Sequence, residues 1–376
     1  MTSMLPAIPP AFGNLKDVFR SAQRSVLGLD NAFNLPAVGS AIVIMVDGLG
    51  VENLTAEAKS APFLSSAPRE TIYSGFPSTT ASSIVSFASG VSNSEHGLFG
   101  YKIYDRSREA GVNLLSGIDK YSVLDYLKVE PISSEEPGQV HAVTLREYSD
   151  SGFTRATMHL AEHHFADSIA GRFEIAATLA NSHDALIYVY VPELDQAAHR
   201  HGVASAEWRN LLSDLDIEIS KLSKILKDNT GLLITSDHGI VDVASENHVF
   251  LDEFMQLRDQ LLDVAGDPRV AFLYLRESNK LQSIKEFLRS QLADRALVVQ
   301  PGELIAASYW QETILQDEDL LPDLVVIAES SVAIYHRDFA KANSLKMVGQ
   351  HGALSSAEIR LPLIGLGAYS SSLLVP

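Results

Sequence analysis

The stretch Thr71–Gly90, TIYSGFPSTTASSIVSFASG, is the part of the chain on which our prediction of the fold rests. Glycine, proline and serine near its centre interrupt the preceding segment. Apolar residues then recur at i, i+3, i+4 and i+7, a spacing that predicts one buried face of a helix. These residues are Ala81, Ile84, Val85 and Ala88.

Both ends of this predicted helix carry suitable capping residues. Ser78 or Thr79 can cap its N-terminus, and Gly90 is suited to end it. A hydroxyl group in the first turn lies beside unpaired N–H groups, where the helix dipole is positive, and this suits a phosphate-like anion with a nucleophile next to it. A capped core helix without such a role would show the same pattern, so the remaining sequence has to decide.

The composition is that of a globular enzyme with a large excess of negative charge. The 376 residues include 29 basic and 47 acidic side chains, for a net charge of −18. This charge argues against a nucleic-acid-binding surface and against binding to an anionic membrane. An anionic substrate would therefore need a local positive centre, such as metal ions or helix ends. Because the chain has no cysteine, disulfides, thiolate metal sites and a cysteine nucleophile are excluded.

The sequence also predicts a soluble, cytoplasmic protein. The first 19 residues lack a charged segment followed by an apolar one, so no signal peptide is expected. No apolar run approaches the roughly 20 residues that a membrane-spanning helix needs.

Buried strands and amphipathic helices alternate along the chain. Continuous apolar runs, typical of parallel strands covered on both faces, occur at Ala41–Val46, Ala185–Val191 and Gly231–Thr235. Shorter strands are predicted at His141–Arg146 and Leu361–Leu366. The predicted helices are Leu15–Leu27, Thr154–Asn181 and Ala204–Lys227. This order predicts an α/β fold with a mostly parallel central sheet and helices on both faces.

The pattern of predicted elements changes between residues 247 and 346. Strands at Val270–Leu275 and Ala296–Gln300 around a helix at Leu281–Leu292 indicate a small inserted α+β lobe. We therefore predict a leader (1–38), a catalytic core (39–246 and 347–376) and an inserted lobe (247–346). Residues 94–134 are polar and are expected to form a loop over the site.

Residues that commonly bind metal ions follow the three buried strands. Asp47, Asp195 and the pair Asp237-His238 come after successive strands, whose carboxyl ends meet at one edge of a parallel sheet. His199 follows Asp195 by four residues and would face the same side of a helix. His351, between glycines, adds another imidazole. Nitrogen and oxygen donors without thiolate favour zinc, with manganese or iron as alternatives.

Other histidines are interpreted as surface or core residues. His159, His163 and His164 fall on the long helix predicted for residues 154–181. His201 and His248 lie near the candidate ligands but fit no ligand spacing.

Taken in order, these motifs resemble the alkaline phosphatase superfamily, and within it the type I phosphodiesterase/nucleotide pyrophosphatase family. They extend from Asp47 to His351, and the inserted lobe and the leader carry none of them. The matching motifs are Val46-Asp47-Gly48, Pro77-Ser78-Thr79-Thr80, Gly90, His96-Gly97, Glu193-Leu194-Asp195 with His199, Asp237-His238-Gly239 and Gly349-Gln350-His351-Gly352.

This resemblance implies an alkaline phosphatase-like sandwich and a centre with two zinc ions. One zinc would be held by Asp195, His199 and His351. The second would be held by Asp47, Asp237 and His238, with the Thr80 oxygen as the remaining ligand. The spacing back from Gly90 favours Thr80 over Thr79 as the nucleophile.

Two positions depart from the family pattern. Tyr101 falls where the family usually has an asparagine that contacts a phosphoryl oxygen, so Tyr101 is the candidate substrate-binding residue. Ser83 replaces another asparagine just after the nucleophile. No arginine of the kind that binds a dianionic phosphate is evident near Thr80, and this favours diesters over monoesters.

The resemblance therefore implies a phosphodiesterase or nucleotide pyrophosphatase that acts on a small phosphodiester or nucleotide through a phospho-threonine. A phosphomonoesterase or phosphonate hydrolase would use the same metal ligands with another pocket. A non-catalytic metal- or nucleotide-binding relative is the alternative from a different class. The sequence does not indicate an oligomeric state.

Overall fold

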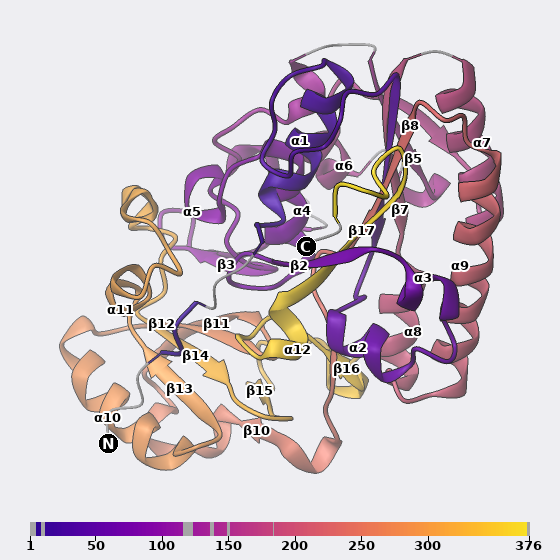
Figure 1. The fold of residues 1–376 in the computed structure, drawn as a ribbon. Coiled ribbons are helices and arrows are strands. Elements are labelled where there is room, and N and C mark those ends of the chain that lie inside the picture. Colours follow the sequence, from indigo (N-terminus) through magenta and orange to yellow (C-terminus); the bar gives the residue numbers. More distant parts are fainter. Residues whose placement is uncertain are drawn as a thin grey trace.

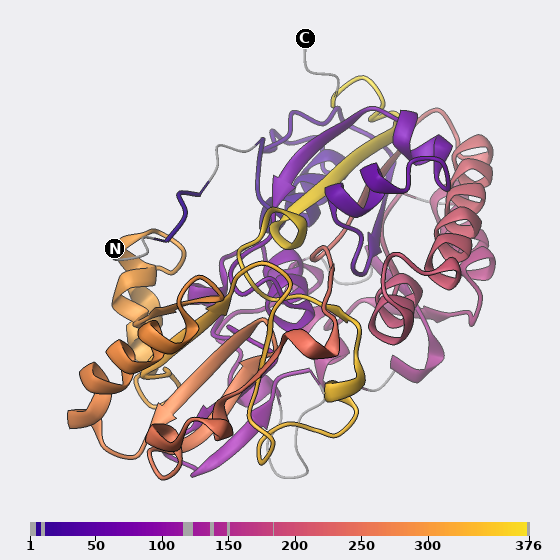
Figure 2. The ribbon, with the colours of Figure 1, turned by 90° about the horizontal axis from the view of Figure 1, so that it is seen from below.

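The computed structural model describes residues 5–8, 12–115, 123–135, 139–148, 151–182 and 184–373. Parts of the predicted leader and of the predicted covering loop therefore lie outside the described residues. Two sheets lie side by side in Figures 1 and 2, with the orange strands of the smaller sheet to one side of the larger one.

The larger sheet has seven strands, and five consecutive ones run parallel. The next strand, β17, is antiparallel to both of its neighbours. This confirms the prediction of an α/β fold with a mostly parallel sheet. Across the sheet the order is β2 (Arg69–Tyr73), β17 (Arg360–Gly367), β8 (Thr230–Thr235), β1 (Ser40–Val46), β7 (Ala185–Val191), β5 (Val140–Thr144) and β6 (Glu162–Phe165).

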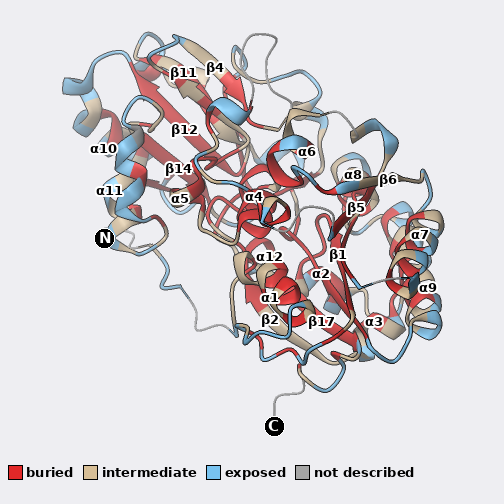
Figure 3. Ribbon diagram, turned by 90° about the horizontal axis from the view of Figure 1, so that it is seen from above, coloured by how far each residue is buried: buried red, intermediate tan, exposed pale blue. Residues whose placement is uncertain are grey.

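Helices cover both faces of this sheet, because the side chains of its central strand alternate between two apolar clusters. Ile42, Ile44 and Val46 of β1 pack with one set of helices, and Ala41 and Val43 pack with the other. Figure 3 shows the strands of the sheet buried, with exposed residues on the outer faces of α7 and α9. The first set is α7 (Ile169–Ser182), α8 (Glu193–His201) and α9 (Ala206–Ile225), and the second is α1 (Lys16–Val26) and α4 (Thr80–Ser89).

Helix α4 follows the sequence prediction closely. Thr79 occupies the N-cap position, although its side chain makes no capping hydrogen bond. Gly90 ends the helix with a φ of 76°, a conformation that glycine adopts without strain. Residues 81–89 are all buried, so α4 is a core helix on every side.

The single helix predicted for Thr154–Asn181 is wrong. The chain forms α6 (Gly152–Thr157), then the edge strand β6, and only then α7. Leu160 interrupts the helix with a φ of 63°, and β6 pairs in parallel with β5. That pairing is a long-range interaction, which the local helical periodicity could not reveal.

The smaller sheet is formed by four strands, and all of its pairings are antiparallel. The predicted strands and helix in this region are confirmed, whereas the domain boundaries at 247 and 346 stay a prediction. One face of the sheet packs on α10, and the other packs toward α4 through Phe272 and Tyr274. The elements are β11 (Leu261–Asp267), β12 (Val270–Leu275), β14 (Leu324–Ala328), β13 (Ala296–Val299), α10 (Leu281–Leu292) and α11 (Pro301–Ala306).

Short elements complete the described structure. None of the helices in the described ranges has the length and apolar character needed to cross a bilayer. The short helices are α2 (Val51–Ala56), α3 (Pro62–Ser66), α5 (Asn93–His96) and α12 (Ser356–Ile359). The short strands pair as β3 (Lys102–Asp105) with β4 (Ala110–Asn113), β9 (Val241–Asp242) with β16 (Gly349–Gln350), and β10 (His248–Phe250) with β15 (Ala333–Tyr335).

A buried ion pair connects the smaller sheet with the segment that leads into β17. Arg269, between β11 and β12, donates from Nε and Nη2 to the two carboxylate oxygens of Glu358 at 3.1 and 2.8 Å. Both side chains are fully buried. Glu358 also accepts a hydrogen bond from the backbone N–H of Ala353, 2.9 Å away. The pair therefore also fixes the loop that carries His351.

We expect Arg269→Met to destabilise the protein by about 3–5 kcal/mol, because it leaves the Glu358 carboxylate buried without its partner. Urea denaturation of the two proteins measures this difference. The matched control is Lys221→Met, which breaks an exposed pair with Glu218 and should cost less than about 1 kcal/mol. Equal effects of the two changes would contradict the role assigned to the buried pair.

Candidate metal centre and active site

The structure brings the predicted ligands together at the carboxyl edge of the larger sheet. Asp47 directly follows β1, and Asp237 and His238 follow β8. Asp195 lies in the first turn of α8, just after β7. Since β8, β1 and β7 are parallel neighbours, their ends place these side chains at one edge.

One group of candidate metal ligands consists of Asp47, Asp237 and His238. All three are buried, and one potential ligand atom from each lies within 4.8 Å of the others. His238 Nε2 is 3.3 Å from Asp47 Oδ1 and 3.5 Å from Asp237 Oδ2. This is the set predicted for one of the two metal ions.

A second group of ligand atoms joins Asp195, His351 and, again, His238. The rings of His238 and His351 stack with centroids 3.6 Å apart. His199 lies at the margin: its Nε2 is 3.3 Å from Asp195 Oδ2, and its ring centroid is 5.4 Å from that of His351. All six predicted Asp and His ligands thus lie in one cluster, with His238 between the two groups.

The first residue of α4 places its hydroxyl in the same cluster. Thr80 Oγ1 lies 3.1 Å from His238 Nε2. The hydroxyl of Thr79 is buried and has no hydrogen-bond partner. Of the two threonines, Thr80 has the side chain with a direct contact to the candidate ligands.

Backbone carbonyl groups orient two of the imidazoles. His199 Nδ1 lies 2.8 Å from the Gly349 oxygen, and His351 Nδ1 lies 3.2 Å from the Ser78 oxygen. Because a carbonyl oxygen can only accept, each Nδ1 carries the proton and each Nε2 keeps a free lone pair. This tautomer is the one that binds a metal ion through Nε2.

Gly48 allows the strand ends to approach closely. Its φ is 77°, and its N–H donates to Asp237 Oδ1 at 3.3 Å. A Cβ atom at this position would lie 2.5 Å from the Ile240 side chain. The Asp-Gly sequence is therefore part of the packing around the cluster and not only a turn.

The cluster is electrostatically suited to cations. Burial, followed by repulsion from Asp237 and Asp195, raises the pKa of Asp47 well above its usual value. Burial also raises the pKa of Asp237 and lowers that of His351. One oxygen each of Asp47, Asp195 and Asp237 is buried without a hydrogen bond. A bound divalent cation would supply the missing partner, so these residues fit a metal centre.

Tyr190 is a contact to the cluster that sequence reasoning missed. This residue of β7 donates its hydroxyl hydrogen bond to Asp47 Oδ2. The only signal in the sequence is a tyrosine near the end of an otherwise apolar strand, ALIYVYV. Its bond leaves the other oxygen of Asp47 directed at His238.

Tyr101, the candidate substrate-binding residue, lies just before β3. Its backbone N–H donates to Asp267 Oδ2 at 3.3 Å, and its side chain is half-buried. Among the contacts of the described residues, none links the Tyr101 hydroxyl to the metal cluster. Its contact with substrate stays a prediction.

The His96-Gly97 motif has a structural explanation. His96 is fully buried, its Nδ1 accepts from the Leu98 N–H at 3.1 Å, and its Nε2 lies 2.9 Å from Ser86 Oγ of α4. Burial lowers the pKa of His96 to about 3, so the neutral ring holds the chain after α5 against α4.

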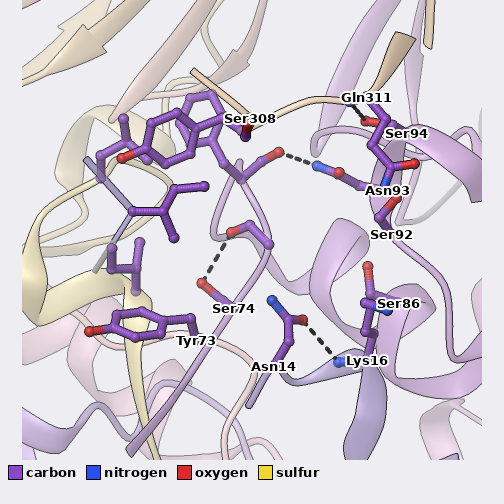
Figure 4. Close-up of a pocket in the computed structure, with 16 residues that line it drawn as sticks. Asn14, Lys16, Tyr73, Ser74, Ser86, Ser92, Asn93, Ser94, Ser308 and Gln311 are labelled. Atoms are coloured by element: carbon purple, nitrogen blue, oxygen red, sulfur yellow. Dashed lines mark hydrogen bonds between the residues drawn. The ribbon is translucent and has the colours of Figure 1, made fainter. Parts of the chain in front are cut away.

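Two hollows lie near these elements. Figure 4 shows a pocket of about 190 Å³ lined by Tyr73, Ser74, Asn93, Ser94 and Gln311, among others, and none of the predicted metal ligands lines it. A hollow of about 490 Å³ instead borders the cluster at His199. Its lining also includes Gln196, Arg200, Asn343, Lys346 and Met347.

Three solved structures share this fold. Murine ectonucleotide pyrophosphatase/phosphodiesterase 5 has 17% identity and a TM-score of 0.64, covering 87% of this chain and 88% of its own. An inactive threonine-to-alanine variant of the murine protein in complex with AMP gives the same identity and TM-score, with 88% of both chains covered. The human counterpart has 16% identity and a TM-score of 0.63, covering 87% and 88%.

The chain thus shares the fold of these three structures. The family model described as type I phosphodiesterase/nucleotide pyrophosphatase matches residues 41–354, and the chain belongs to this family of hydrolases. A search of curated proteins finds no significant match.

The buried His96 predicts a loss of stability in acid. In the unfolded chain the His96 imidazole binds a proton as the pH falls below 6.5, whereas in the folded protein it binds one only near pH 3. Its contribution to the free energy of unfolding therefore falls by about 1.4 kcal/mol per pH unit as the pH drops from 6.5 toward 3. In His96→Gln this dependence should be shallower in urea denaturation between pH 7 and 4.5. The exposed His159→Gln should behave like the wild type, and an unchanged slope in His96→Gln would contradict the assignment.

The contact between Tyr190 and Asp47 predicts a role in metal binding. Tyr190→Phe should weaken metal affinity by about 10–100-fold, because a hydrogen bond that orients a ligand is lost. Competition with a chelator measures the affinity. The matched control is Tyr188→Phe, two residues earlier on β7, whose ring packs with Phe19 and Phe87. Identical affinities in the two variants would argue against this role of Tyr190.

Proposed function

We propose that this protein is a two-metal phosphodiesterase or nucleotide pyrophosphatase that acts through a covalent intermediate on Thr80. The single observation that carries the proposal is the position of Thr80 Oγ1, 3.1 Å from His238 Nε2 inside the buried Asp/His cluster. Membership of the type I phosphodiesterase/nucleotide pyrophosphatase family supports the reaction class.

The proposed metal ions are zinc, because the cluster offers imidazole and carboxylate donors and the chain has no thiolate. Asp195, His199 and His351 would hold one ion, and Asp47, Asp237, His238 and Thr80 the other. When bound, such ions favour the alkoxide form of a hydroxyl ligand and neutralise charge on the transferred phosphorus group.

Thr80 is the proposed nucleophile. Its Oγ1 forms a bond to phosphorus while the bond to the leaving oxygen breaks, and water then cleaves the new ester and restores the hydroxyl. Thr80 begins α4, so the free N–H groups of the first helical turn lie beside the reacting phosphorus and favour its negative charge. A helix buried on all sides holds this geometry rigidly.

A nucleotide is the proposed substrate. The solved structure of the inactive murine variant, which has a similar fold, is a complex with AMP, and this supports a nucleotide-sized ligand. The hollow beside His199 offers Arg200 and Lys346, two cations in a chain of net charge −18. These side chains suit the additional phosphate of a dinucleotide or nucleoside polyphosphate. We also propose that the protein acts in the cytoplasm, which cell fractionation tests.

Thr80→Ala should reduce hydrolysis of a nitrophenyl phosphodiester by about 1,000-fold or more, because the nucleophile is removed. In elemental analysis it should retain both catalytic zinc ions and hence the zinc content of the wild type. Mass spectrometry of acid-quenched wild-type protein should find the phosphorus ester on the peptide that contains Thr80. Thr79→Ala is the matched control and should keep most of the activity.

Different outcomes exclude different parts of the proposal. Preference for the nitrophenyl monoester would contradict a diesterase but keep the nucleophile. Full activity of Thr80→Ala would exclude Thr80 as the nucleophile. Metal-free protein that stays inactive when zinc is restored, although folded, would exclude the metal assignment.

A further inference from the structure

A second group of histidine and carboxylate side chains lies on strands β5 and β6, away from the active site. Its members are His141, Glu162 and His164, and one ligand atom from each lies within 4.8 Å of the others. His141 and Glu162 are direct partners in the parallel pairing of β5 with β6. His164 follows Glu162 by two residues on the same face of the sheet. The register of the sheet therefore creates this group.

The carboxylate distances are those of ligands around one ion, and the two imidazoles lie within hydrogen-bond distance of each other. His141 Nδ1 and His164 Nε2 are 3.1 Å apart. Glu162 Oε2 is 3.6 Å from His141 Nδ1, and Glu162 Oε1 is 3.6 Å from His164 Nε2. Both carboxylate distances are too long for hydrogen bonds. Tetrahedral zinc with ligands at about 2.0–2.2 Å places its ligand atoms roughly 3.3–3.6 Å from each other.

We propose that His141, Glu162 and His164 form a binding site for a divalent metal ion of the zinc class. Two imidazoles and one carboxylate are a common zinc ligand set, with water in the fourth position. The His141 side chain is only 3% exposed, whereas His164 is 22% and Glu162 is 62% exposed. The site thus has a buried base and an open side through which an ion can enter.

This site is separate from the proposed catalytic centre. In the sheet register His141 aligns with Ile187 of β7, which aligns with Ile42 of β1. Asp47 lies five residues beyond Ile42, so His141 and Asp47 are offset by roughly 16 Å along the strands, and β7 lies between β5 and β1. The inference does not rest on the proposed function.

The metal ion connects the edge strand to the rest of the sheet. Among the strands that the structure describes, β6 lies at the edge of the larger sheet and pairs only with β5, over four residues. A short edge strand is among the least firmly held elements of a sheet. An ion bound by one residue of β5 and two of β6 holds the strands in register, so the site has a structural role.

The test is metal titration of the full chain after removal of metal ions with a chelator. Wild-type protein should bind about three zinc ions per chain, two in the catalytic centre and one on β5 and β6. His164→Ala and Glu162→Gln should each bind one equivalent less, or bind it at least about tenfold more weakly. They should keep phosphodiesterase activity at saturating zinc. Zinc should also raise the melting temperature less in these variants than in wild type.

His163→Ala is the matched control, because His163 lies between the two ligands in sequence but on the opposite face of β6. It should bind as many zinc ions as the wild type. Equal stoichiometry and affinity in wild type, His164→Ala and His163→Ala would overturn the inference. If Asp237→Asn loses the catalytic ion assigned to Asp237 but keeps the ion that is sensitive to His164→Ala, the site on β5 and β6 is established independently. If only the catalytic assignment is wrong, the wild type should bind a single zinc ion per chain, and His164→Ala should remove it.

Discussion

The structure depends on the burial of three aspartates at the carboxyl edge of one parallel sheet. Asp47, Asp195 and Asp237 repel each other there, and one oxygen of each is buried without a hydrogen bond. Such an arrangement is costly in a cation-free protein and favourable around divalent ions. The stacked rings of His238 and His351 complete the donor set. The same burial that is costly in the cation-free protein thus suits the candidate metal site.

The smaller sheet supports this arrangement by packing against α4, on the side of the helix that faces away from the larger sheet. Its Phe272 packs in one apolar cluster with Ala81 and Val85 of α4, so the helix that carries Thr80 is buried between the two sheets. The Arg269–Glu358 pair joins that sheet to the loop of His351. The smaller sheet, which carries none of the predicted ligands, therefore helps to hold two segments of the candidate site in place.

Much of the site could be predicted because its residues follow local patterns. Asp47, Asp237 and Asp195 come one, two and four residues after apolar runs long enough to identify as buried strands, and parallel strands bring their ends together. Tyr190 could not be predicted in this way. The strand β7 is a continuous apolar run with two tyrosines, and the run does not show which tyrosine contacts a carboxylate. The strand β6 was missed because its four residues have no apolar run of their own and owe their conformation to pairing with β5.

The sequence by itself determined the class of fold, the three apolar strands that are followed by candidate ligands, and the buried helix that ends at Gly90. Each of these follows from hydrophobic periodicity and from residues at the ends of elements, which are local properties of the chain. Only the tertiary structure decided that His238 lies between both ligand groups and that His141 meets Glu162 and His164. These contacts join residues far apart in sequence through strand register and loop packing, and no local pattern records a register.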